Sequence, residues 1–361
     1  MARILIAPDS FKGSATSTQV AEALKQGWLA LRSYDEVRCL PFADGGEGTL
    51  DCIESVSSRS ERIAITVQGA TGREHRSSWL LVNGETAVIE MAALCGITTV
   101  EKLDPLGAHS FGLGQAIRTA IADTRVKEIL VAVGGSASTD GGTGALQALG
   151  FDFLDGHGES VGLGGAHLKD IAEIIAPIDL ALPERGIKVL VDVQSSLIGE
   201  KGAAHIFAPQ KGANQEDVLL LDAGLTHLLQ LTGHADQRGY GAAGGVSFGL
   251  SAILGADIVS GVETIAALIG LDEKIANSDF VISGEGSFDS QSFSGKAVGY
   301  IVSRTKHHGV QAAIACGVNK NDVTYPVIAL VDLAPSTESA IANSQQWLFE
   351  AGKKLAAGFH H

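Results

Sequence analysis

Four loops of the 361-residue chain place glycines beside carboxylates, hydroxyls or lysines, each after a short apolar segment. The first is APDSFKGS at 7–14, with the candidate residues Asp9, Ser10 and Lys12. This combination suits capture of an anion, because free backbone N–H groups and the dipole of a following helix would face the point that the lysine reaches. An ordinary capped turn with a solvated lysine is the alternative.

The second and third loops are candidates for binding substrate and phosphate. FADGGEGT at 42–49 repeats the first design, with Asp44 next to Gly45 and Gly46. GGSASTDGGTGALQALG at 134–150 offers glycines, hydroxyls and a carboxylate ahead of an expected helix, which is typical of a phosphate cradle. Its candidate residues are Gly134, Gly135, Ser136, Ser138 and Asp140. Alternatively, such glycine pairs only permit tight packing of a helix against a strand.

The fourth loop, SGEGSFDSQSFSGKA at 283–297, places carboxylates near a lysine among glycines. Two carboxylates at this density could hold Mg²⁺, and the lysine could contact the phosphates that the metal neutralises. Mutual ion pairing in solvent is the alternative. The candidates are Glu285 and Asp289 for the metal, Gly284 and Gly286 for nucleotide or phosphate, and Lys296 for catalysis.

Two charged residues stand alone at the ends of other segments. Asp192 closes the apolar segment 187–193, and Lys211 lies in the PQKG sequence. A lone charge at such a place is usually a surface residue, so neither has weight by itself. Together with the four loops, they favour phosphoryl transfer to a small anionic acceptor.

Three familiar motifs fit the sequence poorly. GYGAAG at 239–244 follows polar residues rather than the buried strand that a dinucleotide site requires. GVSFG at 245–249 would make Ser247 the nucleophile of a serine hydrolase, but the strand that should precede it is missing. The Walker A pattern fails because Ala297 follows Lys296, where a serine or threonine belongs.

The expected elements place each glycine-rich loop after a strand. Thr16 and Gln19 have the spacing of a capping box at the start of a helix. Alternating apolar residues from about 63 predict antiparallel strands, and 194–250 reads as rich in loops. The other expected strands are 4–7, 37–42, 128–133, 187–193, 280–283, 311–315 and 327–331; the expected helices are 16–31, from 47, 112–123, 142–149, 262–276, 295–308 and one at the end.

This order predicts an α/β protein of two domains. Residues 1–64 and 255–361 supply five buried strands with helices between them, which suits a flavodoxin-like parallel sheet. Residues 65–254 would form an inserted mixed α/β domain. Because candidate residues occur in both parts, we expect the active site in the cleft between the two domains.

Composition restricts the partners of the chain. Its net charge of −15, without a long run of lysine and arginine, argues against nucleic acid and against an anionic membrane. Four cysteines without a Cys-x-x-Cys pair are typical of a reduced cytoplasm, and the N-terminus does not read as a signal peptide. We assign no function to the terminal His360 and His361, which a purification tag could supply.

The loops resemble those of type I glycerate kinases, in the same order over nearly the whole chain. The shared sequences are APDSFKGS, ADGGEGT, IEMA at 89–92, GGSASTDGG, PQKGA, GAAGG at 241–245, and GEG followed by DSQ and GK. The resemblance implies transfer of a phosphoryl group from ATP, with Mg²⁺, to the 2-hydroxyl of D-glycerate. It also implies a flavodoxin-like domain interrupted by a second α/β domain.

The chain departs from the family pattern at three places. Ser195 and Ser196 follow the strand end at which the family usually has asparagine and proline, and Ser287 replaces a common arginine after GEG. A proline-leucine-glycine turn is replaced by the sequence at 70–72. If these positions touch the substrate, the range of acceptors differs from that of the family.

The leading hypothesis is therefore a kinase that makes 2-phosphoglycerate from D-glycerate. A carboxylate-binding sensor without catalysis and a serine hydrolase are the alternatives. Asp192 is preferred to Asp44 as the base, Lys12 and Lys296 are the catalytic lysines, and Asp9, Ser10, Gly45, Gly46 and Lys211 are expected to bind substrate. The oligomeric state is left open, with a homodimer as one candidate.

Overall fold

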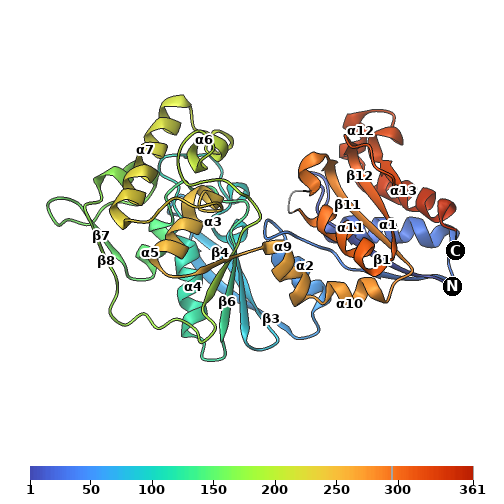
Figure 1. Ribbon diagram of the computed structural model, residues 1–361, viewed down its shortest axis with the longest axis horizontal. Helices are drawn as coiled ribbons and strands as arrows, with labels where there is room; N and C mark the ends of the chain where they lie inside the picture. The colour runs from blue at the N-terminus through green and yellow to red at the C-terminus, as the bar shows by residue number, and fades with distance from the viewer. Residues whose placement is uncertain (294–295, 361) are drawn as a thin grey trace. The chain divides into compact units, whose positions relative to one another are not determined.

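The protein, described here by a computed structural model, forms two compact units (Figure 1). The structure describes residues 1–293 and 296–360, so Gly295 of the Gly-Lys pair and the terminal His361 lie outside the described residues. The first unit contains Met1–Asp44, Asp51–Ser57 and Val262–His361; the second contains Gly45–Leu50 and Ser58–Gly261.

The boundaries of these units differ by a few residues from the predicted boundaries at 64 and 255, at each point where the chain passes from one unit to the other. Strand β3 (Ser60–Gln68) pairs with β4 (Glu74–Val82), and β10 (Asp257–Val259) pairs with β9 (Ile187–Leu190). Both pairs belong to the sheet of the second unit, so residues near 60 and 257 lie in that unit. The predicted cleft between the domains stays a prediction.

The first unit contains the five-stranded parallel sheet that the sequence predicts. Its spatial order is β13-β12-β11-β1-β2, which is the flavodoxin-like order when the five strands are numbered along the chain. The order reverses between β1 and β11. The strands are β1 (Arg3–Pro8), β2 (Glu36–Cys39), β11 (Phe280–Phe288), β12 (Gln311–Asn319) and β13 (Val327–Ala329).

Helices cover both faces of this sheet. Along β12, Ala313 and Ala315 pack with the cluster that includes α1 and α13, whereas Ile314 and Cys316 pack with α11. The predicted capping box starts α1, since the side chains of Thr16 and Gln19 each bind the other's backbone. The helices are α1 (Ser17–Leu31), α2 (Thr49–Val56), α9 (Gly261–Leu268), α10 (Leu271–Ala276), α11 (Ala297–His308), α12 (Thr337–Ala342) and α13 (Ser344–Gly358), with short helical turns η6 (Ser290–Phe293) and η7 (Leu330–Asp332).

A glycine contact holds α1 against α13. A Cβ atom added at Gly27 would lie 2.0 Å from the carbonyl oxygen of Phe349, and one at Gly352 would lie 2.3 Å from that of Leu24. The two backbones therefore approach more closely than any side chain permits. This contact fixes the helix that leads out of the loop after β1.

The second unit contains a six-stranded mixed sheet in the order β10-β9-β6-β5-β4-β3. Strands β3, β4 and β5 are antiparallel, as predicted from residue 63 onward, and the remaining pairs are parallel. Two short strands form a separate hairpin-like pair. The strands not yet given are β5 (Thr86–Glu90), β6 (Glu128–Ala132), β7 (Asp152–Leu154) and β8 (Glu173–Ile175).

The helices of the second unit surround one large apolar core. The region 194–250, which the sequence analysis reads as loops, contains α7, an 18-residue helix with a capping box at Asn214 and Asp217. The helices are α3 (Ala92–Cys95), α4 (Phe111–Ala122), α5 (Thr143–Ala148), α6 (Ala203–Phe207), α7 (Gln215–Thr232) and α8 (Val246–Phe248), with helical turns η1 (Ile97–Thr99), η2 (Gly165–Asp170), η3 (Pro209–Lys211), η4 (Ala242–Gly245) and η5 (Gly249–Ile253).

No helix in the described part of the chain has the length and apolar character needed to cross a membrane. All four cysteines are free thiols, and three of them are buried. Burial raises the pKa of Cys39 to about 11 and that of Cys95 to about 12. These thiols are therefore protonated near neutral pH and unreactive.

Candidate functional site

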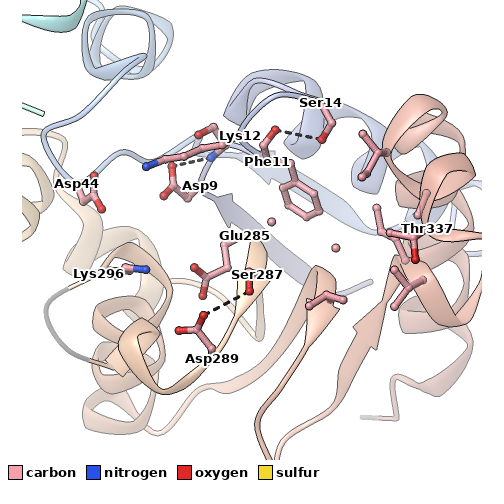
Figure 2. Close-up of a pocket in the computed structure, with 18 residues that line it drawn as sticks. Asp9, Phe11, Lys12, Ser14, Asp44, Glu285, Ser287, Asp289, Lys296 and Thr337 are labelled. Atoms are coloured by element: carbon pink, nitrogen blue, oxygen red, sulfur yellow. Dashed lines mark hydrogen bonds between the residues drawn. The ribbon is translucent and has the colours of Figure 1, made fainter. Parts of the chain in front are cut away.

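The first unit carries a pocket at the carboxyl ends of β1 and β11 (Figure 2). The strand order of the sheet reverses between these two strands, and open α/β sheets bind ligands at such a switch point. The cavity volume is about 400 Å³. Its lining comes from the loop after β1, from β11 and the loop behind it, from β12, and from η7 and α12.

Backbone hydrogen bonds give the loop after β1 its shape. The N–H of Asp9 donates to the Gly284 carbonyl at 2.8 Å, and the N–H of Phe11 donates to the Ala15 carbonyl at 2.8 Å. Gly13 completes the turn with φ at +78°, which favours glycine. As a result Phe11 is buried in the pocket wall, and Lys12 is exposed.

The N-terminus of α1 differs from the expected anion site. The Thr16 hydroxyl accepts a hydrogen bond from the Gln19 N–H at 3.2 Å, and the Gln19 side chain accepts one from the Thr16 N–H at 2.9 Å. The capping box therefore satisfies the backbone N–H groups of Thr16 and Gln19, so these two groups are not available to an anion. By contrast, no side chain of the described residues caps α11, and Lys296 stands at its N-cap position.

Three carboxylates lie close together at one end of the pocket. Burial and the nearby charge of Asp44 raise the pKa of Asp9 to about 7, and the charge of Glu285 adds to this effect. Burial also raises the pKa of Glu285, and one of its carboxylate oxygens, Oε1, is buried without a hydrogen-bond partner among the residues that the structure describes. The pocket thus concentrates negative charge that a cation would neutralise.

Two lysines line the same end of the pocket. Figure 2 shows Lys12 and Lys296 on the side of Asp9, Asp44 and Glu285. The charge of Lys12 opposes the upward shift of the Asp9 pKa, and that of Lys296 opposes the shift of the Glu285 pKa. Among the residues that the structure describes, neither ammonium group forms an ion pair with a carboxylate, so both are available to phosphate oxygens.

The predicted metal residues fit Mg²⁺ bound partly by phosphates. Glu285 offers its unpartnered oxygen, whereas Asp289 accepts hydrogen bonds from the Gln291 N–H at 3.0 Å and the Ser287 hydroxyl at 3.3 Å. Residues 1–293 and 296–360 contain no cluster of three or more metal-ligating side chains. Mg²⁺ commonly binds one or two carboxylates, keeps waters and takes its other ligands from phosphates.

Comparison with known proteins identifies the family of this chain. The model of the glycerate kinase family matches residues 4–360. The chain belongs to the glycerate kinase family. It is 39% identical to the glycerate 2-kinase of Escherichia coli strain K12 over 324 residues, which cover 87% of this chain and 84% of that protein.

Two further members of the glycerate kinase family span almost the whole chain. A glycerate kinase of Haemophilus influenzae is 35% identical over 379 residues, covering 99% of this chain and all of that protein. A crystal structure described as a glycerate kinase 2 from Salmonella typhimurium LT2 matches with a TM-score of 0.81 and 33% identity, covering 99% of this chain and 97% of that one. Fold and sequence therefore give the same family.

The second glycerate kinase loop, at 42–49, packs against the third at the level of the backbone. The Gly134 N–H donates to the Gly45 carbonyl at 3.1 Å, and a Cβ atom at Gly134 would lie 2.6 Å from the Cα atom of Gly46. Glu90, in IEMA, accepts hydrogen bonds from the N–H groups of Gly48 at 3.0 Å and Leu50 at 2.9 Å. Close packing thus accounts for these glycines, and their predicted contact with substrate stays a prediction.

The remaining hydroxyls and the carboxylate of the third loop are buried. Asp140 accepts hydrogen bonds from the Ser110 N–H and hydroxyl, both at 2.7 Å, and so holds the turn in front of α5. Ser138 is fully buried, with no hydrogen-bond partner for its hydroxyl in the described part of the chain. Between 134 and 142, Gly135 is the residue that the structure leaves exposed. The predicted phosphate cradle stays a prediction.

Lys211 is buried beneath this loop rather than exposed on the surface. Its ammonium nitrogen donates to the Ser136 hydroxyl at 2.8 Å and to the Ser138 carbonyl. Burial lowers the pKa of Lys211 to about 7, although the charge of Asp140 opposes the shift. The lysine therefore braces the backbone of 136–138, and it can be neutral near physiological pH.

We expect the stability difference between the wild type and the Lys211→Met variant to depend on pH. The folded pKa of Lys211 lies below its unfolded value of 10.5, so between about pH 7 and 10.5 the unfolded chain binds a proton that the folded chain does not. The free energy of unfolding of the wild type should therefore rise with pH in this window relative to the variant. Urea unfolding of both proteins at pH 7, 8 and 9 measures this slope; parallel curves would show that Lys211 is protonated in the folded protein.

Asp192 lies in the second unit, at the end of the segment that follows β9. Its Oδ1 accepts hydrogen bonds from the Ser260 hydroxyl at 3.0 Å and from the Gly261 N–H at 3.1 Å, where α9 begins. The carboxylate therefore holds this connection in place. Its predicted role as the catalytic base stays a prediction.

The serine hydrolase alternative is wrong. Ser247 is fully buried, and its hydroxyl contacts the carbonyl oxygens of Gly239 at 2.6 Å, Tyr240 at 3.0 Å and Ala242 at 3.2 Å. A nucleophile needs access to substrate and a base as its partner, and this serine has neither in the described structure. The GYGAAG segment forms turns and η4 without a preceding strand, which confirms that it is not a dinucleotide fingerprint.

Sequence analysis missed the apolar end of the pocket. This end is lined by Phe11, Val318, Leu330, Val331, Ala340 and Ile341. Isolated apolar residues give no functional signal, because most of them serve the core. One clue was available: Leu330 and Val331 are the last two residues of the strand predicted at 327–331, and so they share the carboxyl edge of the sheet with the polar loops. In the structure β13 already ends at Ala329, and both residues belong to η7.

Proposed function

We propose that this chain transfers the γ-phosphoryl group of ATP to D-glycerate and forms 2-phosphoglycerate. Membership of the glycerate kinase family supports the acceptor. The observation that supports the reaction type is the pocket at the switch point. Two lysines that form no ion pair with any described residue stand there beside Asp9, Asp44 and Glu285. Such an arrangement suits phosphates accompanied by a metal ion.

The lysines and carboxylates would divide the work of charge neutralisation. We propose that Lys12 and Lys296 bind phosphate oxygens, helped by the N-terminus of α11. Gly286, which lines the pocket on β11, would let the backbone approach the same phosphates, whereas Gly284 packs against Ala315 and its predicted phosphate contact stays a prediction. Glu285 and Asp289 would hold Mg²⁺, which supplies positive charge to the transferred group. Phosphoryl transfer depends mainly on this positioning and charge stabilisation.

We propose that Asp9 acts as the base on the acceptor hydroxyl. In the reaction, the hydroxyl oxygen of glycerate bonds to the γ-phosphorus, the bond to the ADP oxygen breaks, and the hydroxyl proton must leave. A base with a pKa near 7 suits this task, and Asp9 lines the pocket beside the lysines. The sequence pointed to Asp192 or Asp44 instead, and both remain candidates for the same test.

Ser10 lines the pocket next to Asp9, and we propose that it contacts glycerate. Gly45, Gly46 and Lys211 belong to the second unit, and their predicted contacts with substrate stay predictions. Ser287, which replaces a common arginine of the family, also lines the pocket. A shorter, uncharged side chain there leaves one positive charge fewer near the substrates. The cytoplasmic location and the homodimer stay predictions.

We expect Mg²⁺-dependent formation of ADP and 2-phosphoglycerate when the protein is incubated with ATP and D-glycerate. Phosphorus NMR distinguishes the 2-phosphate from the 3-phosphate, and a coupled assay follows ADP. Turnover that persists in EDTA, or a product phosphorylated only on the 3-hydroxyl, would contradict the proposal. Binding of glycerate without consumption of ATP would instead support the sensor.

A further inference from the structure

We propose that the apolar end of the switch-point pocket holds the purine ring of the phosphoryl donor. This proposal rests on the proposed function in so far as the donor is a nucleoside triphosphate. It adds the residues that recognise the purine ring, and it assigns the apolar end of the pocket to the donor rather than to glycerate.

The pocket has two chemically different ends. Figure 2 shows the labelled carboxylates and lysines on one side and Thr337, at the start of α12, on the other. Near Thr337, the side chains of Leu330, Val331 and Ala340 supply an apolar wall. Phosphates suit the charged end, and a flat heteroaromatic ring suits the apolar end.

The size of the pocket favours a ligand larger than glycerate. A volume of about 400 Å³ lies within the range of roughly 300–1,000 Å³ that holds cofactors and drug-sized molecules. A three-carbon acid would leave most of this space empty. Glycerate also carries a polar group on every carbon, so it offers nothing to the apolar wall.

Two neighbouring glycines form part of the pocket floor. Gly286 and Gly317 lie side by side on neighbouring strands, and a Cβ atom at Gly317 would lie 2.4 Å from the Gly286 carbonyl oxygen. Both glycines line the pocket, so no side chain on these two residues separates the apolar end from the charged end. A nucleotide could therefore extend along the floor from base to phosphates.

Two substitutions test the proposed purine site in different ways. Ala340→Leu adds volume to the apolar wall, because Ala340 is only 4% exposed and lines the pocket. Ile341→Asp places a charge at the rim, where the side chain is 56% exposed and the fold should tolerate the change. Leu219→Asp is the matched control, since Leu219 is 57% exposed on α7 in the second unit.

The measurement is calorimetric binding of Mg-ADP and, separately, of Mg-tripolyphosphate, which has no base. We expect Ala340→Leu and Ile341→Asp to weaken ADP binding about tenfold to a hundredfold. Ala340→Leu should leave tripolyphosphate binding within about twofold, and Leu219→Asp should change neither ligand. Equal losses for both ligands in Ala340→Leu, or unchanged ADP binding in both pocket variants, would overturn the proposal.

The outcome is separable from that of the proposed function. If the wild type binds ADP through this site but does not phosphorylate glycerate, the proposed purine site stands and the proposed activity fails. If the wild type is an active glycerate kinase but substitutions at residues 340 and 341 do not change its ADP affinity, the proposed activity stands. The purine ring then binds at another place. If Ala340→Leu does not fold, Ile341→Asp tests the proposal by itself. Its loss of affinity for Mg-ADP is then compared with its loss of affinity for Mg-tripolyphosphate.

Discussion

Replacing Asp9 by asparagine should lower kcat by about 10²- to 10⁴-fold, which is the usual contribution of a general base. Asparagine keeps the shape of the side chain and can still accept the Ser10 N–H hydrogen bond that Asp9 receives at 2.6 Å. It cannot take up the hydroxyl proton. The KM for ATP should change little, because the lysines and the metal ligands remain.

The dependence of activity on pH gives a second test of Asp9 as the base. A base must be deprotonated to act, and burial together with Asp44 raises the pKa of Asp9 to about 7. The kcat/KM of the wild type, which reports the free enzyme, should therefore rise with pH up to about 7 and then level off. The residual activity of Asp9→Asn should lack this acidic limb.

Two other variants decide between Asp9 and the bases that the sequence favoured. If Asp9→Asn keeps a near-normal kcat while Asp192→Asn loses it, the base lies in the second unit at the position first predicted. Loss of activity only in Asp44→Asn would move the role to that residue, which shapes the Asp9 pKa. If all three variants remain active, the carboxylates are structural and the mechanism fails.

Replacing Lys296 by methionine should lower kcat/KM for ATP by about 10²- to 10³-fold, the range seen when one electrostatic contact to a transition state is removed. Lys296 stands at the N-cap of α11, forms no ion pair among the described residues and lies near Glu285. The variant loses charge stabilisation in the transition state and a phosphate contact in the ground state. Therefore kcat should fall and KM for ATP should rise together.

The matched control lies on the same helix. Lys306, in the last turn of α11, is exposed and does not line the pocket, so Lys306→Met should leave both kinetic constants within about twofold. Initial rates at varied ATP and saturating D-glycerate give the two constants. Equal behaviour of the two methionine variants would show that Lys296 does not contact the donor.

Periodic apolar segments made the first unit predictable. Its strands β1, β11, β12 and β13 each contain a short apolar run, and the spacing of Thr16 and Gln19 marked the start of α1. Long α7 was missed because its apolar residues nearly surround the helix, so LLLDAGLTHLLQL shows no single stripe. The predicted domain boundaries at 64 and 255 differ from those of the structure because strand pairing, rather than composition, assigns β3 and β10 to the second sheet.

The sequence by itself determined the fold class and the family, since residue types and their order along the chain are sufficient for these. It also predicted the loops that we propose carry the chemistry. Tertiary structure alone decided which residues meet. Asp9 and Glu285 lie 276 positions apart and come together because β1 and β11 are neighbours at the point of reversal. Lys211 and Ser247 look equally polar in the sequence, yet both are buried, because hydrogen bonds to nearby carbonyls and hydroxyls satisfy them inside the core.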